Sequence, residues 1–210
     1  MPDLTLGPPA GEVVLFGAGS PIVVDIEETC HRAGWSIFAA IRNVDGPVHT
    51  GPSIPILTPD NDAWRAHPVL VPLFRPANRF SAWQQAVSLG TTDFPRLLDP
   101  TSILPRRIDI EEGVYINAGC VLGAGSRIGR FAFVNRGASL GHHLDLGAFA
   151  SIGPGAVIAG QVTIGPNAMI GTGAVILPGI TVGAGALVGA GCVIRSDVPA
   201  GSVVRGTDRP

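Results

Sequence analysis

Aliphatic residues recur at every sixth position through the C-terminal half of the chain. Fifteen consecutive positions of this series hold Ile, Leu or Val without an insertion. They are Ile110, Ile116, Leu122, Ile128, Val134, Leu140, Leu146, Ile152, Ile158, Ile164, Ile170, Ile176, Val182, Val188 and Ile194. A period of six fits neither the 3.6-residue period of an α-helix nor simple strand alternation. The pattern therefore indicates an internal repeat of six residues.

The other positions of the repeat are restricted as well. Glycine often follows the aliphatic residue, and the fifth position is usually small or β-branched, with Leu144 and Ile180 as larger exceptions. Glycine and asparagine let a tight corner adopt unusual backbone angles. We infer that each hexad forms a short strand and a corner, with its aliphatic side chain inside a narrow prism. Three hexads would make a triangular coil, and fifteen would make five coils, each contacting only its neighbours.

The N-terminal half shows a different pattern. Residues 12–16 predict a buried strand, residues 17–20 a glycine turn, residues 21–34 an amphipathic helix and residues 35–40 a second strand. A strand, a Gly-x-Gly turn and a helix begin many nucleotide-binding units. These elements predict a small Rossmann-like domain. Whether it binds a nucleotide stays open, because the third glycine of the longer dinucleotide motif is absent.

The predicted boundary between the two domains lies near residue 98. Residues 46–60 are rich in Pro, Gly and Thr and predict a loop. Residues 69–74 predict a third strand, and residues 79–89 a second helix. The predicted fold is an α/β Rossmann-like domain over residues 1–97, followed by an all-β parallel β-helix over residues 98–210.

Composition narrows the function classes. Hydrophobic residues make up 46% of the 210 residues and charged residues 14%, which is ample for a buried core. The net charge of −2 gives no basic surface for nucleic acid or an anionic membrane. All basic residues are Arg, so chemistry that needs a lysine, such as a Schiff base, is excluded.

The chain has three cysteines, Cys30, Cys120 and Cys192, which lie far apart in the sequence. An odd number at such spacing argues against a disulfide framework and against a zinc knuckle. Cys120 and Cys192 fall at the small core position of their hexads and are expected to be packing thiols. The sequence has no leader-like start and no apolar run near the ~20 residues of a membrane span. We therefore expect a soluble, cytoplasmic protein.

Two adjacent histidines, His142 and His143, are the only ones in the repeat, and they fall at a corner. A corner side chain points away from the prism, so neither is expected to be a packing residue. Imidazole titrates near neutrality and suits a general base in acyl transfer. Gly160 lies one coil further on in the same column, where its N–H could face a developing oxyanion.

A metal site is the competing use of these histidines. Zinc needs three or four ligands within reach, and no other His, Cys or ordered carboxylate pair joins His142 and His143. A β-helix of the γ-type carbonic anhydrase kind would need further histidines in neighbouring columns. We therefore expect no metal.

Two segments carry a family resemblance. The segment from Val134 to His142 and the closing segment from Ser196 to Gly206 resemble the NeuD/PglD-like family of sialic-acid O-acetyltransferases and nucleotide-amino-sugar N-acetyltransferases. The resemblance implies a left-handed coil, a homotrimer, acetyl-CoA as co-substrate and a sugar or nucleotide-sugar acceptor. Left-handed winding runs against the usual right-handed crossover, so it is expected from the resemblance alone.

The resemblance also assigns roles to residues. It implies His142 as the catalytic base and Asn135 as a residue near the acceptor. It implies that the Gly160 amide faces the thioester. Thr172 and Ala190 match positions that line the acetyl-CoA groove.

The chain departs from the family at three places. The family usually has Asp or Glu directly after its catalytic histidine, whereas this chain has His143, so His143 and Asp145 are the candidates to orient His142. A second family histidine is replaced by Ser151, which we place in the acetyl-CoA site. The family's glycine-rich turn usually contains a His, whereas residues 17–22 of this chain contain none, and Gly17 and Gly19 are its candidates for acceptor binding. A sugar acetyltransferase is therefore expected, and the alternative is a β-helix that serves as a binding or scaffold protein without catalysis.

Overall fold

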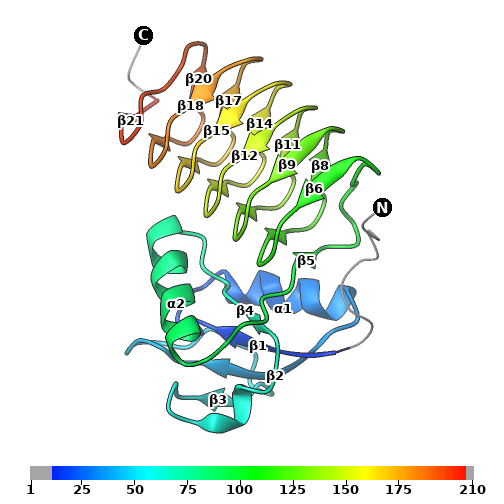
Figure 1. The fold of residues 1–210 in the computed structure, drawn as a ribbon, viewed down its shortest axis with the longest axis vertical. Coiled ribbons are helices and arrows are strands. Elements are labelled where there is room, and N and C mark those ends of the chain that lie inside the picture. Colours follow the sequence, from blue (N-terminus) through cyan, green and yellow to red (C-terminus); the bar gives the residue numbers. More distant parts are fainter. Residues whose placement is uncertain (1–10, 207–210) are drawn as a thin grey trace. The chain divides into compact units, whose positions relative to one another are not determined.

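The computed structural model describes residues 11–206, and the chain divides into two compact units with the boundary between Pro100 and Thr101 (Figure 1). The first unit mixes strands with two α-helices. The second contains only short strands and corners.

The first unit is built on a parallel sheet with strand order β3-β2-β1-β4. Its elements are β1 (Glu12–Phe16), α1 (Val23–Arg32), β2 (Ser36–Ile41), β3 (Ile56–Leu57), the 3-10 helix η1 (Asp62–Trp64), β4 (Val69–Leu70), α2 (Pro76–Ser88) and β5 (Leu97–Leu98). The central strand β1 is apolar and buried from its second residue onward, which gives this unit its core.

The predicted strand, turn, helix and strand at the start of the chain are confirmed, with ends that shift by one or two residues. The third strand is shorter than predicted, because Pro72 lacks the N–H that would extend β4. Helix α2 begins earlier, since Pro76 suits the first helical turn. The loop prediction for residues 46–60 was wrong at β3, which pairs in parallel with β2.

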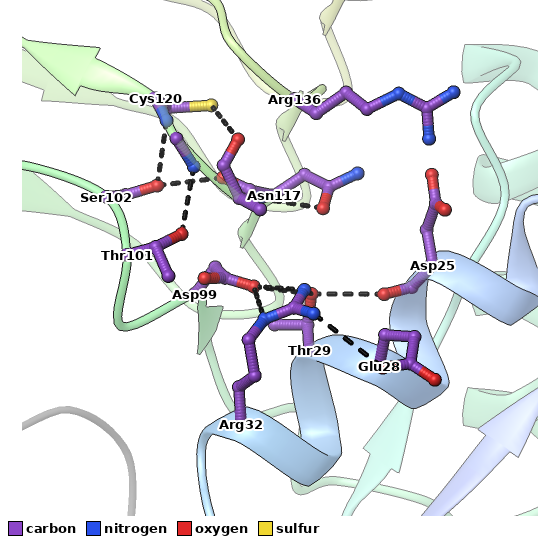
Figure 2. Close-up of polar contacts among 12 residues, drawn as sticks. Asp25, Glu28, Thr29, Arg32, Asp99, Thr101, Ser102, Asn117, Cys120 and Arg136 are labelled. Atoms are coloured by element: carbon purple, nitrogen blue, oxygen red, sulfur yellow. Dashed lines mark hydrogen bonds and ion pairs between the residues drawn. The ribbon is translucent and has the colours of Figure 1, made fainter.

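Helix α1 is anchored by a buried carboxylate, that of Asp99. The Asp99 side chain is fully buried, and its Oδ2 accepts hydrogen bonds from Arg32 Nε at 2.8 Å, Arg32 Nη2 at 2.6 Å and Thr29 Oγ1 at 3.0 Å (Figure 2). A buried charge is tolerated only when it is paired and hydrogen-bonded in this way. The network therefore fixes the last turn of α1 against the chain that follows β5.

We expect Asp99→Ala to lower the free energy of unfolding by about 2–4 kcal/mol, because Arg32 and Thr29 lose a buried acceptor. The matched control is Glu28→Ala. Glu28 contacts the same arginine at 3.8 Å, but its side chain is 69% exposed. An exposed pair of this kind contributes at most about 0.5 kcal/mol. Urea unfolding of both variants measures the difference, and equal losses would contradict an anchoring role for Asp99.

The second unit is a parallel β-solenoid made of three sheets, whose coils stack along one axis (Figure 1). The first sheet contains β7 (Tyr115–Ile116), β10 (Phe133–Val134), β13 (Ser151–Ile152), β16 (Met169–Ile170), β19 (Leu187–Val188) and β21 (Val203–Val204). The second contains β8 (Val121–Leu122), β11 (Ser139–Leu140), β14 (Val157–Ile158), β17 (Val175–Ile176) and β20 (Val193–Ile194). The third contains β6 (Ile108–Ile110), β9 (Ser126–Ile128), β12 (Asp145–Leu146), β15 (Thr163–Ile164) and β18 (Thr181–Val182).

The hexad pattern is confirmed by both pairing and burial. Residues that pair between neighbouring coils, such as Ser139 with Val157 and Asp145 with Thr163, are 18 positions apart, except between β19 and β21, where they are 16 apart. All fifteen aliphatic residues of the repeat are at most 5% exposed. One aliphatic side chain per hexad therefore fills the interior of the solenoid.

The outward side of the second sheet carries a stripe of valines. Val121, Val157 and Val193 are 43–45% exposed there, which is unusual for large apolar side chains at matching positions of alternate coils. We call this set the valine stripe. The outward side of the third sheet is polar, and Arg127 there forms ion pairs with both Asp145 and Glu111.

The first coil is closed by two hydroxyl groups. Elsewhere a corner N–H donates to a carbonyl of the preceding coil, as Gly137 N does to Ala118 O. Gly119 N donates instead to Thr101 Oγ1 at 3.0 Å, and Cys120 N donates to Ser102 Oγ at 3.0 Å (Figure 2). These side chains supply acceptors at the end of the stack.

All three cysteines are free and buried. Burial raises the pKa of the Cys30 thiol to about 12, so this residue stays protonated near neutral pH. Within residues 11–206 no helix combines the length and the apolar character needed to cross a bilayer.

We expect Ile152→Ala to lower the free energy of unfolding by about 2–5 kcal/mol, since Ile152 is fully buried in a central coil and the stack cannot collapse around the cavity. Thr163→Ala, on the exposed side of the third sheet, is the control and should change it by less than about 0.5 kcal/mol. Chemical denaturation followed by circular dichroism measures both. A loss below 1 kcal/mol for Ile152→Ala would contradict a tightly packed prism.

Candidate active site

The two adjacent histidines lie at the corner between β11 and β12, and both are exposed, as predicted. Gly141, just before them, allows this corner to stack closely on the next one. A Cβ on Gly141 would lie 2.5 Å from Gly160 N and 2.6 Å from Ala159 O, closer than real atoms approach. The glycine therefore lets the histidine corner sit directly against the corner that contains Gly160.

The backbone of the histidine corner is fixed on both sides. His143 N donates to Ala124 O of the preceding coil at 3.0 Å, and Gln161 N of the following coil donates to His142 O at 2.8 Å. His143 adopts a positive φ of 55°, a conformation that costs most residues energy. Gly125 and Gln161, at the same position of neighbouring corners, also have positive φ. The stacking of the coils thus sets the backbone conformation of this corner, and His143 adopts the conformation of its neighbours.

The two imidazole rings contact each other and their neighbouring coils. His142 Nδ1 and His143 Nδ1 are 2.9 Å apart, with the ring planes at 84°. The His142 ring covers Gly160, where an added Cβ would lie 2.6 Å from both Cε1 and Nε2. The His143 ring covers Gly125, where an added Cβ would lie 3.0 Å from Cδ2 and Nε2. The rings therefore extend in opposite directions along the stack.

The amide of Gly160 is a candidate donor to a ligand. Among residues 11–206 it donates no hydrogen bond to the protein, and Gly160 is only half-buried. The N–H groups of Thr172 and Ala190, at the first position of other corners, are also without a protein acceptor in the described chain. What distinguishes Gly160 is the imidazole edge of His142 beside it.

Asp145 was a second candidate to orient His142, and its carboxylate binds an arginine instead. Asp145 Oδ1 accepts from Arg127 Nη1 at 3.0 Å, and Glu111 also pairs with Arg127. These two carboxylates raise the pKa of Arg127, and the hydrogen bond that Arg127 donates to Asp145 is the largest cause. The hydrogen bond made by His142 goes to His143 and not to Asp145.

Three other predicted residues lie at a different corner of the coil. Asn135, Thr172 and Ala190 follow strands of the first sheet, so the second sheet separates them from His142 within one chain. Thr172 and Ala190 are exposed. Asn135 is 4% exposed, and its Oδ1 accepts from Asn117 Nδ2 at 3.0 Å and Arg136 N at 2.8 Å. The Asn135 side chain is thus part of a buried amide ladder.

Ser151, at the start of β13, is fully buried. It pairs with Phe133 and Met169 in the first sheet, away from the histidine corner. The structure therefore brings His142, His143 and Gly160 together and keeps Ser151 apart from them.

Known proteins were compared with this site and fold. Residues 143–177 and 161–196 match the family described as bacterial transferase hexapeptide (six repeats). No curated protein sequence matches the chain. Solved structures match over nearly the full length of both chains.

Several of these structures come from Caulobacter crescentus and contain CoA and GDP-perosamine. PerB is 28% identical, with 94% of each chain covered and a TM-score of 0.81. A perosamine N-acetyltransferase variant with a histidine replaced by asparagine is 25% identical, with 94% of each chain covered and a TM-score of 0.80. The acetyltransferase domain of PglB from Neisseria gonorrhoeae, with acetyl coenzyme A, is 27% identical over 93% of this chain and 96% of that one, with a TM-score of 0.76.

The chain is a hexapeptide-repeat acyltransferase.

The glycine turn of this acyltransferase lies in the first unit, between β1 and α1. Gly17 has a φ of 122° and is buried, and its N–H donates to Ile41 O at 3.1 Å. Gly19 is half-buried and lies near Pro47 O. The turn therefore exists as predicted, at the carboxyl end of the central strand.

The described part of the acyltransferase, residues 11–206, contains no group of three or more His, Cys, Asp and Glu side chains that could hold a metal ion. The functional groups at the histidine corner are the two imidazoles and the Gly160 amide. Sequence reasoning identified these residues but not the hydrogen bond between the two rings. No sequence signal reports which way adjacent corner side chains turn.

We expect Gly160→Ala to displace the His142 ring, because the new methyl group would overlap Cε1 and Nε2. Alanine itself fits this corner position, since Ala124 occupies it two coils earlier, so the loss of stability should stay below about 1.5 kcal/mol. Gly206→Ala is the control, because its Cβ would meet only Ala190 O at 3.7 Å. A crystal structure or the His142 ring shifts in NMR would show the displacement. An unmoved ring would contradict the contact.

Proposed function

We propose that this protein transfers the acetyl group of acetyl-CoA to an amino or hydroxyl group of a sugar or nucleotide-linked sugar. The observation that carries the proposal is the exposed His142 imidazole against Gly160, at a corner of a solenoid whose solved relatives hold CoA or acetyl-CoA. The proposal includes the left-handed sense of the coil and a Rossmann-like first unit. The strand order β3-β2-β1-β4 supports the latter.

In the proposed mechanism His142 is the general base. Its Nε2 takes the proton of the acceptor amine or hydroxyl while the acceptor forms its bond to the thioester carbon. The C–S bond then breaks, and His142 returns the proton to the CoA sulfur. The products are the acetylated sugar and free CoA. The replacement of a histidine in the Caulobacter relative supports a role for histidine in this kind of enzyme.

The Gly160 amide is the proposed oxyanion donor. A preorganised N–H that makes no hydrogen bond within the protein pays no reorganisation cost when charge develops on the thioester oxygen. Such donors typically contribute about 3–4 kcal/mol to transition-state stabilisation.

The acetyl-CoA groove is proposed to form between two copies of the chain. Thr172 and Ala190 lie at a different corner from His142, so one chain does not bring the two sets together. The valine stripe on the sheet between these corners supports burial by another copy. In a homotrimer each chain would contact the next around a closed ring, which gives three identical grooves. Ser151, being fully buried, would support this groove from behind and not touch the ligand.

The acceptor is proposed to be a sugar that carries a nucleotide. GDP-perosamine in the Caulobacter structures supports this class. Gly17 and Gly19 would approach the nucleotide through their backbone, and Asn135 would support the acceptor site through its buried amide ladder. The Gly17 N–H is already bonded to Ile41 O, so Gly19 and the start of α1 are the freer part of this turn.

We expect His142→Asn to lower kcat about 10²–10⁴-fold with little change in the KM for acetyl-CoA, because a base acts only in the transition state. Free CoA released from acetyl-CoA is measured with thiol reagent across a panel of UDP- and GDP-linked amino sugars. His31→Asn, an exposed histidine on α1, is the matched control. Full activity in His142→Asn would remove His142 from this role.

The same assay tests the scaffold alternative. A protein that keeps the fold without catalysis would release no CoA with any acceptor and would bind no acetyl-CoA in calorimetry. Acetyl-CoA binding without transfer across the panel would instead mean that the acceptor class is wrong.

A further inference from the structure

The hydrogen bond between His142 and His143 restricts the protonation of both rings. Their Nδ1 atoms are 2.9 Å apart, and a hydrogen bond needs one donor and one acceptor. When both rings are neutral, only two arrangements satisfy this contact. Either His142 Nδ1–H donates to His143 Nδ1, or the reverse. In each case the two rings must hold opposite tautomers, since a neutral imidazole carries one proton.

The side of the His142 ring that faces Gly160 distinguishes the two arrangements. Cε1 and Nε2 lie against Gly160, where the proposed acyl site would be. If His143 were the donor, His142 would carry its proton on Nε2 and could not accept another there. If His142 is the donor, Nε2 keeps its lone pair on the side of Gly160.

We propose that His143 is a positioning residue that accepts a hydrogen bond from His142 Nδ1–H, and so holds the Nε2 lone pair of His142 toward Gly160. This inference rests on the proposed function of His142 as the base. The role is one that a carboxylate commonly fills beside a catalytic histidine. In this chain a neutral imidazole fills it.

His143 is itself held in place by the stack. Its backbone N–H donates to Ala124 O, and its ring lies against Gly125, which has no side chain to displace it. Asp145 accepts a hydrogen bond from Arg127, so it could accept one from His142 only if it released that arginine. The corners before and after, residues 123–126 and 159–162, contain no ionisable side chain. His143 is therefore the ionisable group built against the Nδ1 atom of His142.

The hydrogen bond to the neutral His143 ring matters most when His142 becomes positively charged. Once Nε2 of His142 takes a proton, its Nδ1–H belongs to a cation, and a charge-assisted hydrogen bond is roughly twice as strong as a neutral one. The contact with His143 then stabilises the protonated base more than the resting base. An interaction that strengthens in this way contributes to catalysis, whereas a constant interaction contributes only to binding.

Two substitutions separate this role from a purely structural one. His143→Gly removes the ring and suits the positive φ, since Gly125 has the same backbone conformation at the preceding corner. His143→Asn also tolerates a positive φ, and its Oδ1 lies near the place of Nδ1 and can accept the same hydrogen bond. Both variants are therefore expected to fold, and they differ in whether the acceptor remains.

The experiment uses full-length protein labelled with ¹⁵N in its histidines, without ligand, near pH 8. NMR of the ring nitrogens reports which nitrogen of each imidazole carries the proton. We expect His142 as the Nδ1–H tautomer and His143 as the Nε2–H tautomer. His142 should keep its tautomer in His143→Asn and become a mixture in His143→Gly. In the CoA-release assay, kcat should fall about 10–100-fold in His143→Gly and by less than about threefold in His143→Asn.

Two results would overturn the inference. One is wild-type His142 in the Nε2–H tautomer, and the other is a His142 tautomer that does not change in His143→Gly. Acetyl transfer with either result would leave the proposed function standing and remove His143 from its role. Failure of transfer with every acceptor would count against the proposed function, while the tautomer measurement would still decide the role of His143.

Discussion

The backbone hydrogen bonds between coils impose one constraint on which everything else in the second unit depends. From β6 to β20 the strands pair with residues 18 positions away, so a side chain in an inner coil has a defined neighbour above and below. The narrow interior accepts one aliphatic side chain per hexad, and an insertion would move the whole following column. The uninterrupted series from Ile110 to Ile194 reflects this constraint directly.

The same register brings the chemical groups together. His142 and Gly160 are too far apart in the sequence to meet in a local turn. They are neighbours in space because they are one coil apart at the same corner. The corners can vary in side chain because their backbone conformation is set by the stack. Gly125, His143 and Gln161 share a positive φ although their side chains differ completely. Chemistry can therefore change at a corner without a change of fold.

The sequence was most informative where periodicity applied. Column arithmetic placed Gly160 beside His142, and the interior residues followed from spacing alone. It was less informative where three-dimensional packing decides. The buried amide ladder of Asn117 and Asn135 looks like two ordinary corner residues in the sequence. The hydrogen bond between the histidine rings depends on rotamers, which periodicity does not specify. The short strand β3 was not predicted, because two residues in a region rich in proline and glycine are too few to show a hydrophobic periodicity.

The hydroxyl groups of Thr101 and Ser102 have a consequence for assembly. A stack of parallel coils ends in a row of backbone groups that could pair with the end of another molecule, and open strand edges of this kind promote fibre growth. Here the N–H groups of Gly119 and Cys120 are already occupied by side chains of the same chain. These two corner N–H groups are therefore unavailable for pairing with another molecule, because hydroxyl groups of the same chain already accept from them.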